Sequence, residues 1–324
     1  MAKAGWGDAD RAVLAGDASN RSYDRLKLGG ENRVLMVAPP EKGEDIRPFV
    51  QITDLLRNQS LSAPEIFASD PELGLMLIED LGDDLFARLA GDPVVERELY
   101  DAAVDVLATF GGMSELTDVA PYDTATYQRE ARLVTEWYIP AVTGAKVAEE
   151  DEAQFLDLIA EACANATENT LVLRDYHAEN LLWLPERGGN ARVGLLDYQD
   201  ALLGDRVYDL VSLLEDARRD VSNGIQNAEK KRFLESGGFE ERPFQQVYSA
   251  LGAQRNLKIV GIFTRLAVRD GKAHYPDLIP RVWGYLMGDL GHPSLTVLKD
   301  WVDRHVPPPT PANLAAIRDK VHAG

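Results

Sequence analysis

The chain is poor in cysteine, in histidine and in positive charge. Its 324 residues include one cysteine and five histidines, and 34 Lys and Arg stand against 53 Asp and Glu, for a net charge of −19. The lone Cys163 excludes an intrachain disulfide, which is typical of a protein of a reducing compartment. The acid excess repels phosphate backbones and anionic lipid headgroups, and it therefore argues against general binding to nucleic acid or to a membrane surface.

Long apolar runs are missing as well. No stretch approaches the roughly 20 apolar residues that span a bilayer. Trp6, Asp8 and Asp10 stand where a signal peptide would need an unbroken apolar run, so we expect a cytoplasmic protein. Hydrophobic residues make up 45% of the chain and charged residues 27%, which is an ordinary globular composition. The length is sufficient for two domains or two lobes.

The first eighty residues carry the signals of a small sheet. Runs typical of strands occur at 12–15, 23–28, 33–38 and 75–78, and Gly29-Gly30 has the composition of a hairpin turn. Apolar residues at helical spacing occupy 49–58, 96–110, 125–138, 151–168, 208–221, 244–268 and 312–322, and short β-like runs stand at 171–174 and 193–196. We therefore expect a β-rich nucleotide lobe over residues 1–80 and a helical catalytic and substrate lobe over residues 81–324.

Polar residues suited to phosphoryl transfer are concentrated after residue 173. Asp175 and Asn180 have the Asp-x-x-x-x-Asn spacing of a phosphotransferase catalytic loop, although such a pair arises about once by chance in a chain of this size. Asp197 follows an apolar run, from which a hairpin could bring it to Asn180 to share a magnesium ion. Mg²⁺ prefers oxygen donors and nucleotide phosphates, and a carboxylate such as Asp175 is suited to orient the attacking hydroxyl.

Three segments of this region resemble the aminoglycoside phosphotransferase family of kinase-like enzymes. They are Arg174-Asp175-Tyr176-His177-Ala178-Glu179-Asn180, Leu196-Asp197-Tyr198-Gln199-Asp200-Ala201 and Gly204-Asp205-Arg206-Val207-Tyr208-Asp209-Leu210. With residues 16–23, 34–40 and 212–219, they look most similar to the anomeric N-acetylmuramate/N-acetylglucosamine kinases of bacterial cell-wall recycling.

The resemblance implies an α+β, protein-kinase-like two-lobe fold. Such a fold has a small antiparallel β lobe, a large mainly helical lobe, and ATP bound between them. The resemblance casts Asp175 as the catalytic base and Asn180 and Asp197 as ligands of Mg²⁺, and it places the adenine on the backbone around Glu79 and Leu81. The residues expected to support this site without touching the reacting atoms are His177, Asp200 and Asp209.

Two positions depart from the family pattern. Leu173 stands where many relatives have a histidine that organises the catalytic loop. Met36 stands where kinases have the strand lysine that grips the α- and β-phosphates, so another cation must take that place. Alternation puts Arg25 and Lys27 on one face of the neighbouring strand, and Lys42 is a third candidate in the following loop.

Further contacts with ligands are expected from a loop and from a helix. Ser19 and Asn20 are small polar residues of a loop that could cover the ATP phosphates. Arg255 belongs to a basic stripe, completed by Lys258, Arg265 and Arg269. This stripe either pairs with nearby carboxylates or binds an anionic substrate group, such as the lactyl carboxylate of N-acetylmuramate. Arg174 is a second candidate for substrate contact.

The sequence favours an ATP-dependent kinase that uses Mg²⁺ to phosphorylate the anomeric hydroxyl of N-acetylmuramate or N-acetylglucosamine. Three alternatives stay open at this point. The charge of −19 suits aminoglycosides as acceptors, choline- or homoserine-type kinases use the same constellation, and Met36 and Leu173 motivate a nucleotide-binding module without turnover. The expected partners are thus a nucleotide and an amino sugar, while the oligomeric state is left open between monomer and dimer.

Overall fold

The chain folds into two compact units. The computed structural model describes residues 4–16, 20–113, 116, 118–238 and 240–321. The first unit consists of residues 1–106 and 173–201, and the second of residues 107–172 and 202–324. These units differ from the division at residue 80, because the segment with Asp175, Asn180 and Asp197 is bound to the N-terminal part. Ala87 N–H, for example, donates to Ala178 C=O at 3.0 Å.

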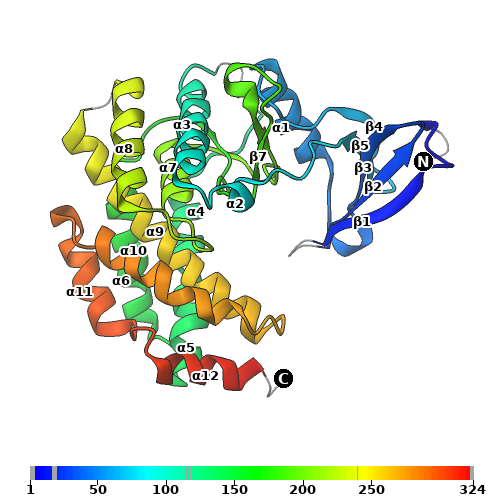
Figure 1. Ribbon diagram of the computed structural model, residues 1–324. Coiled ribbons are helices and arrows are strands. Elements are labelled where there is room, and N and C mark those ends of the chain that lie inside the picture. The colour runs from blue at the N-terminus through cyan, green and yellow to red at the C-terminus, as the bar shows by residue number, and fades with distance from the viewer. Residues whose placement is uncertain (1–3, 17–19, 114–115, 117, 239, 322–324) are drawn as a thin grey trace. The chain divides into compact units, whose positions relative to one another are not determined.

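An antiparallel sheet of five strands forms the N-terminal part of the first unit (Figure 1). The strands lie in the order β1 (Asp10–Gly16), β2 (Ser22–Leu28), β3 (Glu31–Val37), β5 (Leu75–Glu79) and β4 (Ile66–Asp70). Gly29 and Gly30 join β2 to β3 at φ of 59° and 88°, the left-handed values that a two-residue hairpin of this kind requires. The four strands expected from the sequence are confirmed, and β4 is additional.

The two faces of the sheet differ in chemistry. On one face Leu26, Leu35 and Leu77 form a buried cluster, against which Trp6 packs. On the other face the register aligns Tyr23 with Met36 and Met76 in one row, and Arg25 with Val34 and Ile78 in the next. Because Tyr23, Val34 and Ile78 line a cavity, this second face is the one that builds the site.

Short elements complete the first unit. Helix α1 (Arg47–Asn58) buries Phe49, Ile52 and Leu56, and a single-turn helix α2 (Phe86–Leu89) contacts strand β7. Strands β7 (Leu181–Trp183) and β8 (Val193–Leu195) form an antiparallel hairpin. Helix α3 (Pro93–Phe110) begins in this unit.

The second unit is mainly helical. Helix α9 (Glu241–Val268) has buried residues on all its sides, as a central helix does, and packs against α4, α6, α7, α10 and α12. The other helices are α4 (Thr124–Ala131), α5 (Ile139–Thr143), α6 (Glu149–Cys163), α7 (Val207–Leu214), α8 (Asn223–Gly237), α10 (Ile279–Asp289), α11 (Thr296–His305) and α12 (Pro311–Val321). A short pair of strands, β6 (Thr170–Val172) and β9 (Leu202–Gly204), accompanies them.

Three of the expected helices end earlier than the sequence suggests, and the described residues form five additional helices. The helix expected at 125–138 ends at Ala131 and is followed by a π-helical turn over Val134–Tyr138, and the one expected at 208–221 ends at Leu214. The helix expected at 151–168 ends at Cys163, and helices α2, α5, α8, α10 and α11 are additional. Cys163 is buried at the end of α6, and burial raises the pKa of its thiol to about 12, which makes it an inert core residue.

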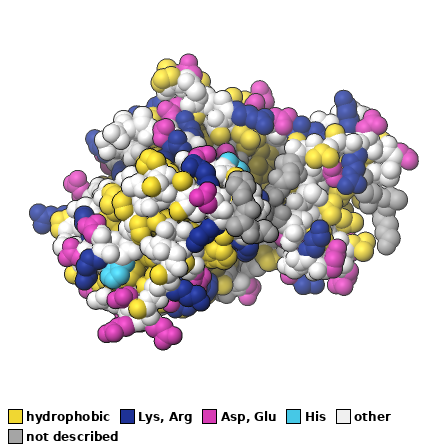
Figure 2. Space-filling model, turned by 90° about the horizontal axis from the view of Figure 1, so that it is seen from below, with side chains coloured by type: hydrophobic (Ala, Val, Ile, Leu, Met, Phe, Trp, Pro, Cys, Tyr) yellow, Lys and Arg dark blue, Asp and Glu magenta, His cyan; other side chains and the backbone are white. Residues whose placement is uncertain are grey.

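Charges of both signs occur on the face of the molecule seen from below (Figure 2). On the face that Figure 2 shows, acidic side chains are interspersed with basic ones. Among the residues described, no helix combines the length and the apolar character needed to cross a bilayer.

A polar cluster lies buried beside the middle of α9. Asn256 Nδ2 donates to Glu215 Oε2 at 2.8 Å and to Asp289 Oδ2 at 3.0 Å. Gly252 permits this approach, since a Cβ there would lie 2.4 Å from Asp289 Oδ2. Burial, and next the charge of Glu215, raise the pKa of Asp289 well above its ordinary value, even though Lys230 also faces the cluster and lowers it. The folded state therefore favours the protonated form of Asp289.

The substitution Asp289→Asn should make stability less dependent on pH. The unfolded chain releases this proton near pH ~4, whereas the folded chain keeps it to higher pH, so the wild type loses stability as the pH rises through that window. Asn keeps the shape and cannot titrate. Urea unfolding should show that the free energy of unfolding of the variant, relative to that of the wild type, is higher at pH 8 than at pH 5. The expected increase is about 1.4 kcal/mol for each unit by which the pKa of Asp289 is raised within this pH range. The same difference in free energy of unfolding between variant and wild type at both pH values would contradict this. The control is Asp319→Asn, at an exposed position.

Candidate active site

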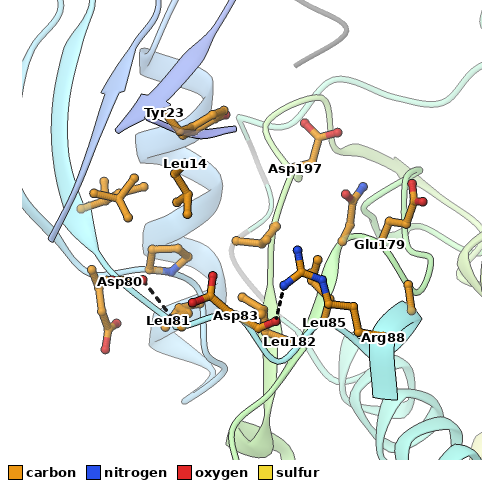
Figure 3. A pocket seen from close by; sticks show the side chains of 18 of the residues that line it. Leu14, Tyr23, Asp80, Leu81, Asp83, Leu85, Arg88, Glu179, Leu182 and Asp197 are labelled. Atoms are coloured by element: carbon orange, nitrogen blue, oxygen red, sulfur yellow. Dashed lines mark hydrogen bonds between the residues drawn. The ribbon is translucent and has the colours of Figure 1, made fainter. Parts of the chain in front are cut away.

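A cavity of about 600 Å³ lies within the first unit (Figure 3). Its walls are largely apolar, with Leu14, Val34, Phe49, Ile78 and Leu182 among them, and its polar residues include Asp80, Asp83, Glu179, Asn180 and Asp197. In Figure 3, Tyr23 and Asp197 lie toward one end, and Asp80, Leu81 and Asp83 lie toward the other. A mainly apolar pocket with a few polar groups is typical of a small-ligand site.

The β7–β8 hairpin brings two of the polar residues to the same wall. Asn180 immediately precedes β7, and Asp197 follows β8 after one residue, Leu196. The strands pair from Leu181 opposite Leu195, and Leu196 N–H donates to Asn180 C=O at 3.0 Å. Both side chains line the cavity as a consequence.

The loop before β7 is held by the side chain of Asn180. Its Nδ2 donates to Asp175 C=O at 2.9 Å and lies 3.4 Å from Nε2 of the buried His177. This donation commits the nitrogen end of the amide to the loop, so Oδ1 is the amide atom on which a ligand role would depend. The hydroxyl of Tyr176 anchors the loop by donating to Ala103 C=O at 2.9 Å. The side chain of Asp175, in contrast, is exposed.

Asp197 has a strained backbone and a supported side chain. Its φ is 56°, a left-handed value that is costly for a residue with a Cβ, and Arg174 in the loop has φ of 73°. Gln199 Nε2 donates to Asp197 Oδ1 at 2.9 Å and to Asp200 Oδ2 at 3.2 Å. Arg21 Nη1 lies 3.8 Å from Asp197 Oδ1. Strain of this kind is common at functional positions, where neighbours hold the residue in place.

The next residue, Tyr198, anchors this turn to helix α1. Its hydroxyl shares a hydrogen bond of 2.7 Å with Thr53 Oγ1, and its ring centroid lies 4.9 Å from that of Phe49. Burial raises the pKa of Tyr198 above its ordinary value. The position of Asp197 is therefore coupled to α1 through a buried side chain.

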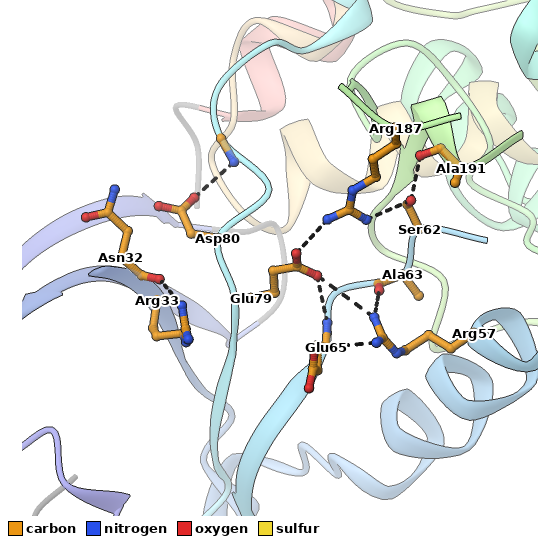
Figure 4. Close-up of polar contacts among 11 residues, drawn as sticks. Asn32, Arg33, Arg57, Ser62, Ala63, Glu65, Glu79, Asp80, Arg187 and Ala191 are labelled. Carbon is orange, nitrogen blue, oxygen red and sulfur yellow. Dashed lines mark hydrogen bonds and ion pairs between the residues drawn. The ribbon is translucent and has the colours of Figure 1, made fainter. Parts of the chain in front are cut away.

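The end of β5 is tied to the β7–β8 hairpin by an ionic network (Figure 4). Arg187 Nη2 donates to Glu79 Oε1 at 2.5 Å and its Nη1 donates to Ser62 Oγ at 2.7 Å. Ser62 Oγ in turn donates to Ala191 C=O at 2.6 Å, and Glu65 N–H donates to Glu79 Oε2 at 3.2 Å. The network fixes the segment from Glu79 to Leu81 at one end of the cavity.

Residues 10–245 match the model of the phosphotransferase enzyme family. The chain belongs to this family. It is 39% identical to a Caulobacter vibrioides protein named N-acetylmuramate/N-acetylglucosamine kinase, over 94% of each chain. It is 33% identical to a Pseudomonas aeruginosa protein of the same name, over 87% of this chain and 85% of that one. The chain is thus an enzyme of the phosphotransferase family.

Solved structures confirm the fold class. An aminoglycoside phosphotransferase in ternary complex with ADP and hygromycin B superimposes with a TM-score of 0.61, at 13% identity and over 89% of this chain and 97% of that one. The α+β, protein-kinase-like fold expected from the sequence, with an antiparallel β part and a helical part, is therefore present.

Arg25 and Lys27, two of the cations expected in the β part, lie at different positions along β2. Arg25 donates to Asp80 at 2.6 and 2.9 Å and to Asp83 at 2.8 Å, at the end of the cavity near Leu81. Its hydrogen bond lowers the pKa of Asp83. Lys27 is exposed near the opposite end of β2 from Tyr23.

The polar loop before β2 is only partly described. Asn20 N–H donates to Glu44 Oε1 at 3.1 Å, and Asn20 Nδ2 donates to Lys42 C=O at 3.3 Å. Ser19 lies outside the described residues. Asn20 is therefore placed by the segment that leads into α1.

Other expected residues lie in the second unit or at the edge of the first. Asp209 is completely buried in α7. Arg255 is also buried and donates to Ser212 Oγ at 2.8 Å. Other members of the basic stripe do pair with acids, as Lys258 with Glu130 at 3.1 Å and Arg269 with Asp270 at 2.6 Å. Arg174 Nη1 donates to Asp200 C=O at 3.1 Å.

A double-mutant cycle tests the anchor beneath Asp197. Tyr198→Phe removes one buried hydrogen bond and should lower the free energy of unfolding by about 1 kcal/mol, whereas Tyr198→Ala removes the packed ring and should lower it by about 3–5 kcal/mol. Thr53→Val removes the other partner. Chemical denaturation of Tyr198→Phe, Thr53→Val and the variant with both changes should show a coupling energy of about 1 kcal/mol between the two residues. Simple addition of the two single effects would refute the bond.

Proposed function

We propose that this phosphotransferase uses ATP and Mg²⁺ to phosphorylate the anomeric hydroxyl of N-acetylmuramate or N-acetylglucosamine. The observation that carries the proposal is the hairpin that brings Asn180 and Asp197 to one wall of the cavity, directly after the loop with Asp175. The acceptor is taken from the names of the two relatives, each of which covers most of this chain. Likeness to an aminoglycoside phosphotransferase at 13% identity supports only the fold.

The cavity fits a nucleotide. Its volume of about 600 Å³ is within the range of small-ligand pockets, and the side chains of Leu14, Val34 and Ile78 offer apolar contact to a flat base. The backbone from Glu79 to Leu81, fixed by Arg187, is the expected partner of the adenine edge. A relative in fold was solved with ADP, which supports ATP as the donor.

The donor set fits magnesium. Asn180 Oδ1 and the Asp197 carboxylate are hard oxygen ligands, and Gln199 orients the carboxylate. Within the described residues no group of three or more His, Cys, Asp and Glu side chains is suited to a metal. A magnesium ion held here would take its remaining ligands from phosphate oxygens and water, as Mg²⁺ commonly does.

In the proposed reaction, Asp175, Asn180 and Asp197 each have a separate role. Asp175 accepts a hydrogen bond from the sugar hydroxyl, aligns its oxygen with the γ-phosphorus and receives the proton at its carboxylate. Asn180 holds the loop in place through its bond to Asp175 C=O. When bound, Mg²⁺ neutralises charge on the phosphate oxygens. Asp197 and Asn180 would position the metal ion and would take no part in bond making.

The same proposal places the enzyme in the cytoplasm. ATP is available there, and the single, buried Cys163 is compatible with reducing conditions.

The proposal is tested by assaying ATP consumption with N-acetylmuramate, N-acetylglucosamine, kanamycin and choline. We expect turnover with the amino sugars, with loss of one reducing end for each ADP formed, because phosphorylation at the anomeric oxygen blocks the aldehyde. Asp175→Asn should lower kcat by about 10²- to 10⁴-fold, as expected for loss of a general base. The control is Glu186→Gln, an exposed acid in the β7–β8 turn.

Two results would overturn the proposal. Turnover with kanamycin or choline and with neither sugar would show a different acceptor. ADP formation with an intact reducing end would show that a different hydroxyl is phosphorylated.

A further inference from the structure

The pocket face of the sheet has an uncharged residue at a position where kinases need a cation. Met36 lies two residues after the cavity-lining Val34, on the same face of β3, and only 1% of it is exposed. Kinases carry the lysine that binds the α- and β-phosphates on this strand. A thioether cannot neutralise phosphate, so the charge must come from another residue.

Arg21 lies where its side chain can reach this place. In the register of β2 and β3, Ser22 is opposite Val37 and Tyr23 is opposite Met36. Arg21 immediately precedes β2 and has the parity of Tyr23, which makes it the diagonal neighbour of Met36, at a typical separation of about 7–8 Å. An arginine is long enough to cover that distance.

The contacts of Arg21 place its side chain near Asp197, at the end of the cavity where the metal is proposed to bind. Its Nε donates to Glu44 Oε2 at 2.8 Å, and its Nη1 lies 3.8 Å from Asp197 Oδ1. The side chain is 11% exposed and that of Glu44 is 13% exposed. Glu44 also accepts from Asn20 N–H at 3.1 Å, so one carboxylate fixes two consecutive residues.

We infer that Arg21 replaces the strand lysine as the cation that binds the α- and β-phosphates, and that Glu44 holds it in position. The inference rests on the proposed use of ATP but not on the identity of the acceptor. Asp197 would hold the metal, and Arg21 beside it would contact the phosphate oxygens that the metal leaves exposed. A guanidinium suits this task because its fork of donors matches phosphate oxygens.

The charge of Arg21 is secure in this environment. Burial would lower its pKa, but the hydrogen bond with Glu44 and the charges of Glu44 and Asp197 outweigh burial and raise the pKa above its ordinary value. Arg21 is thus a permanent cation at neutral pH.

Two further arginines are bound at the other end of the cavity. Arg25 is bound to Asp80 and Asp83 at the end of the cavity near Leu81. Arg88, which also lines the cavity, donates to Asp83 C=O at 3.3 Å, at that same end. Lys27 lies opposite Asn32 near the far end of β2 from Tyr23 and is exposed, and Lys42 is exposed as well.

Nucleotide binding without any acceptor sugar tests the inference. Isothermal titration with ADP and with adenosine should show that Arg21→Gln weakens ADP binding by about 10- to 100-fold, the loss expected for charge-assisted hydrogen bonds, and leaves adenosine binding unchanged. Arg21→Lys should restore part of the ADP affinity. Glu44→Gln should weaken ADP binding less than Arg21→Gln does.

The matched control is Arg33→Gln. Arg33 belongs to the same sheet, but its guanidinium lies 4.0 Å from the centre of the Phe67 ring and pairs with Glu31, away from the cavity. It should bind ADP as the wild type does.

The outcomes separate this inference from the proposed function. Unchanged ADP affinity in Arg21→Gln would overturn it, and so would an equal loss of ADP and adenosine binding, which would show a merely structural role. If Arg21→Gln loses ADP binding selectively while the wild type transfers no phosphate to either sugar, the role of Arg21 is supported and the proposed acceptor is refuted.

Discussion

The pairing of β7 with β8 is the constraint on which the site depends. Three residues in each strand are enough to place Asn180 and Asp197 on neighbouring chain segments, and the bond from Leu196 N–H to Asn180 C=O closes that end. The same hairpin carries Arg187, which fixes Glu79 and with it one end of the cavity. One small element thereby sets the separation between the proposed metal ligands, Asn180 and Asp197, and the segment proposed to receive the adenine.

Charge is balanced locally around the cavity. Asp80 and Asp83 lie near Arg25, and Asp197 lies near Arg21. This arrangement explains how a chain with a net charge of −19 can hold a polyanionic nucleotide, because the charge of the whole chain has little influence at the distance of a direct contact. The overall charge therefore says little about this pocket.

The sequence predicts the parts of the fold whose patterns are local. The strands with alternating residues, the Gly29-Gly30 turn and the hairpin between Asn180 and Asp197 follow from local spacing. Strand β4 is missed because its apolar residues, Ile66, Phe67 and Ala68, are consecutive and do not alternate with polar ones. Helix α8 is missed because only three of its described residues are buried, Ile225, Glu229 and Phe233. Helix α10 is hidden by Pro280 at its start and by Gly284 and Gly288 within it.

Contacts that depend on distant segments cannot be predicted in this way. Arg21 precedes its strand, so alternation within β2 pointed to Arg25 instead, and only the fold shows that Glu44 and Asp197 meet Arg21. The burial of Arg255 depends in the same way on Ser212 of α7, which helical spacing in α9 does not reveal.

The most direct test of this account is Mn²⁺ binding, followed by electron paramagnetic resonance in the presence of a non-hydrolysable ATP analogue. If the hairpin builds the metal site, Asn180→Leu and Asp197→Asn should each weaken Mn²⁺ affinity by about 10-fold or more, while exposed Glu186→Gln in the same hairpin should not. Wild-type affinity in both ligand variants would contradict the account.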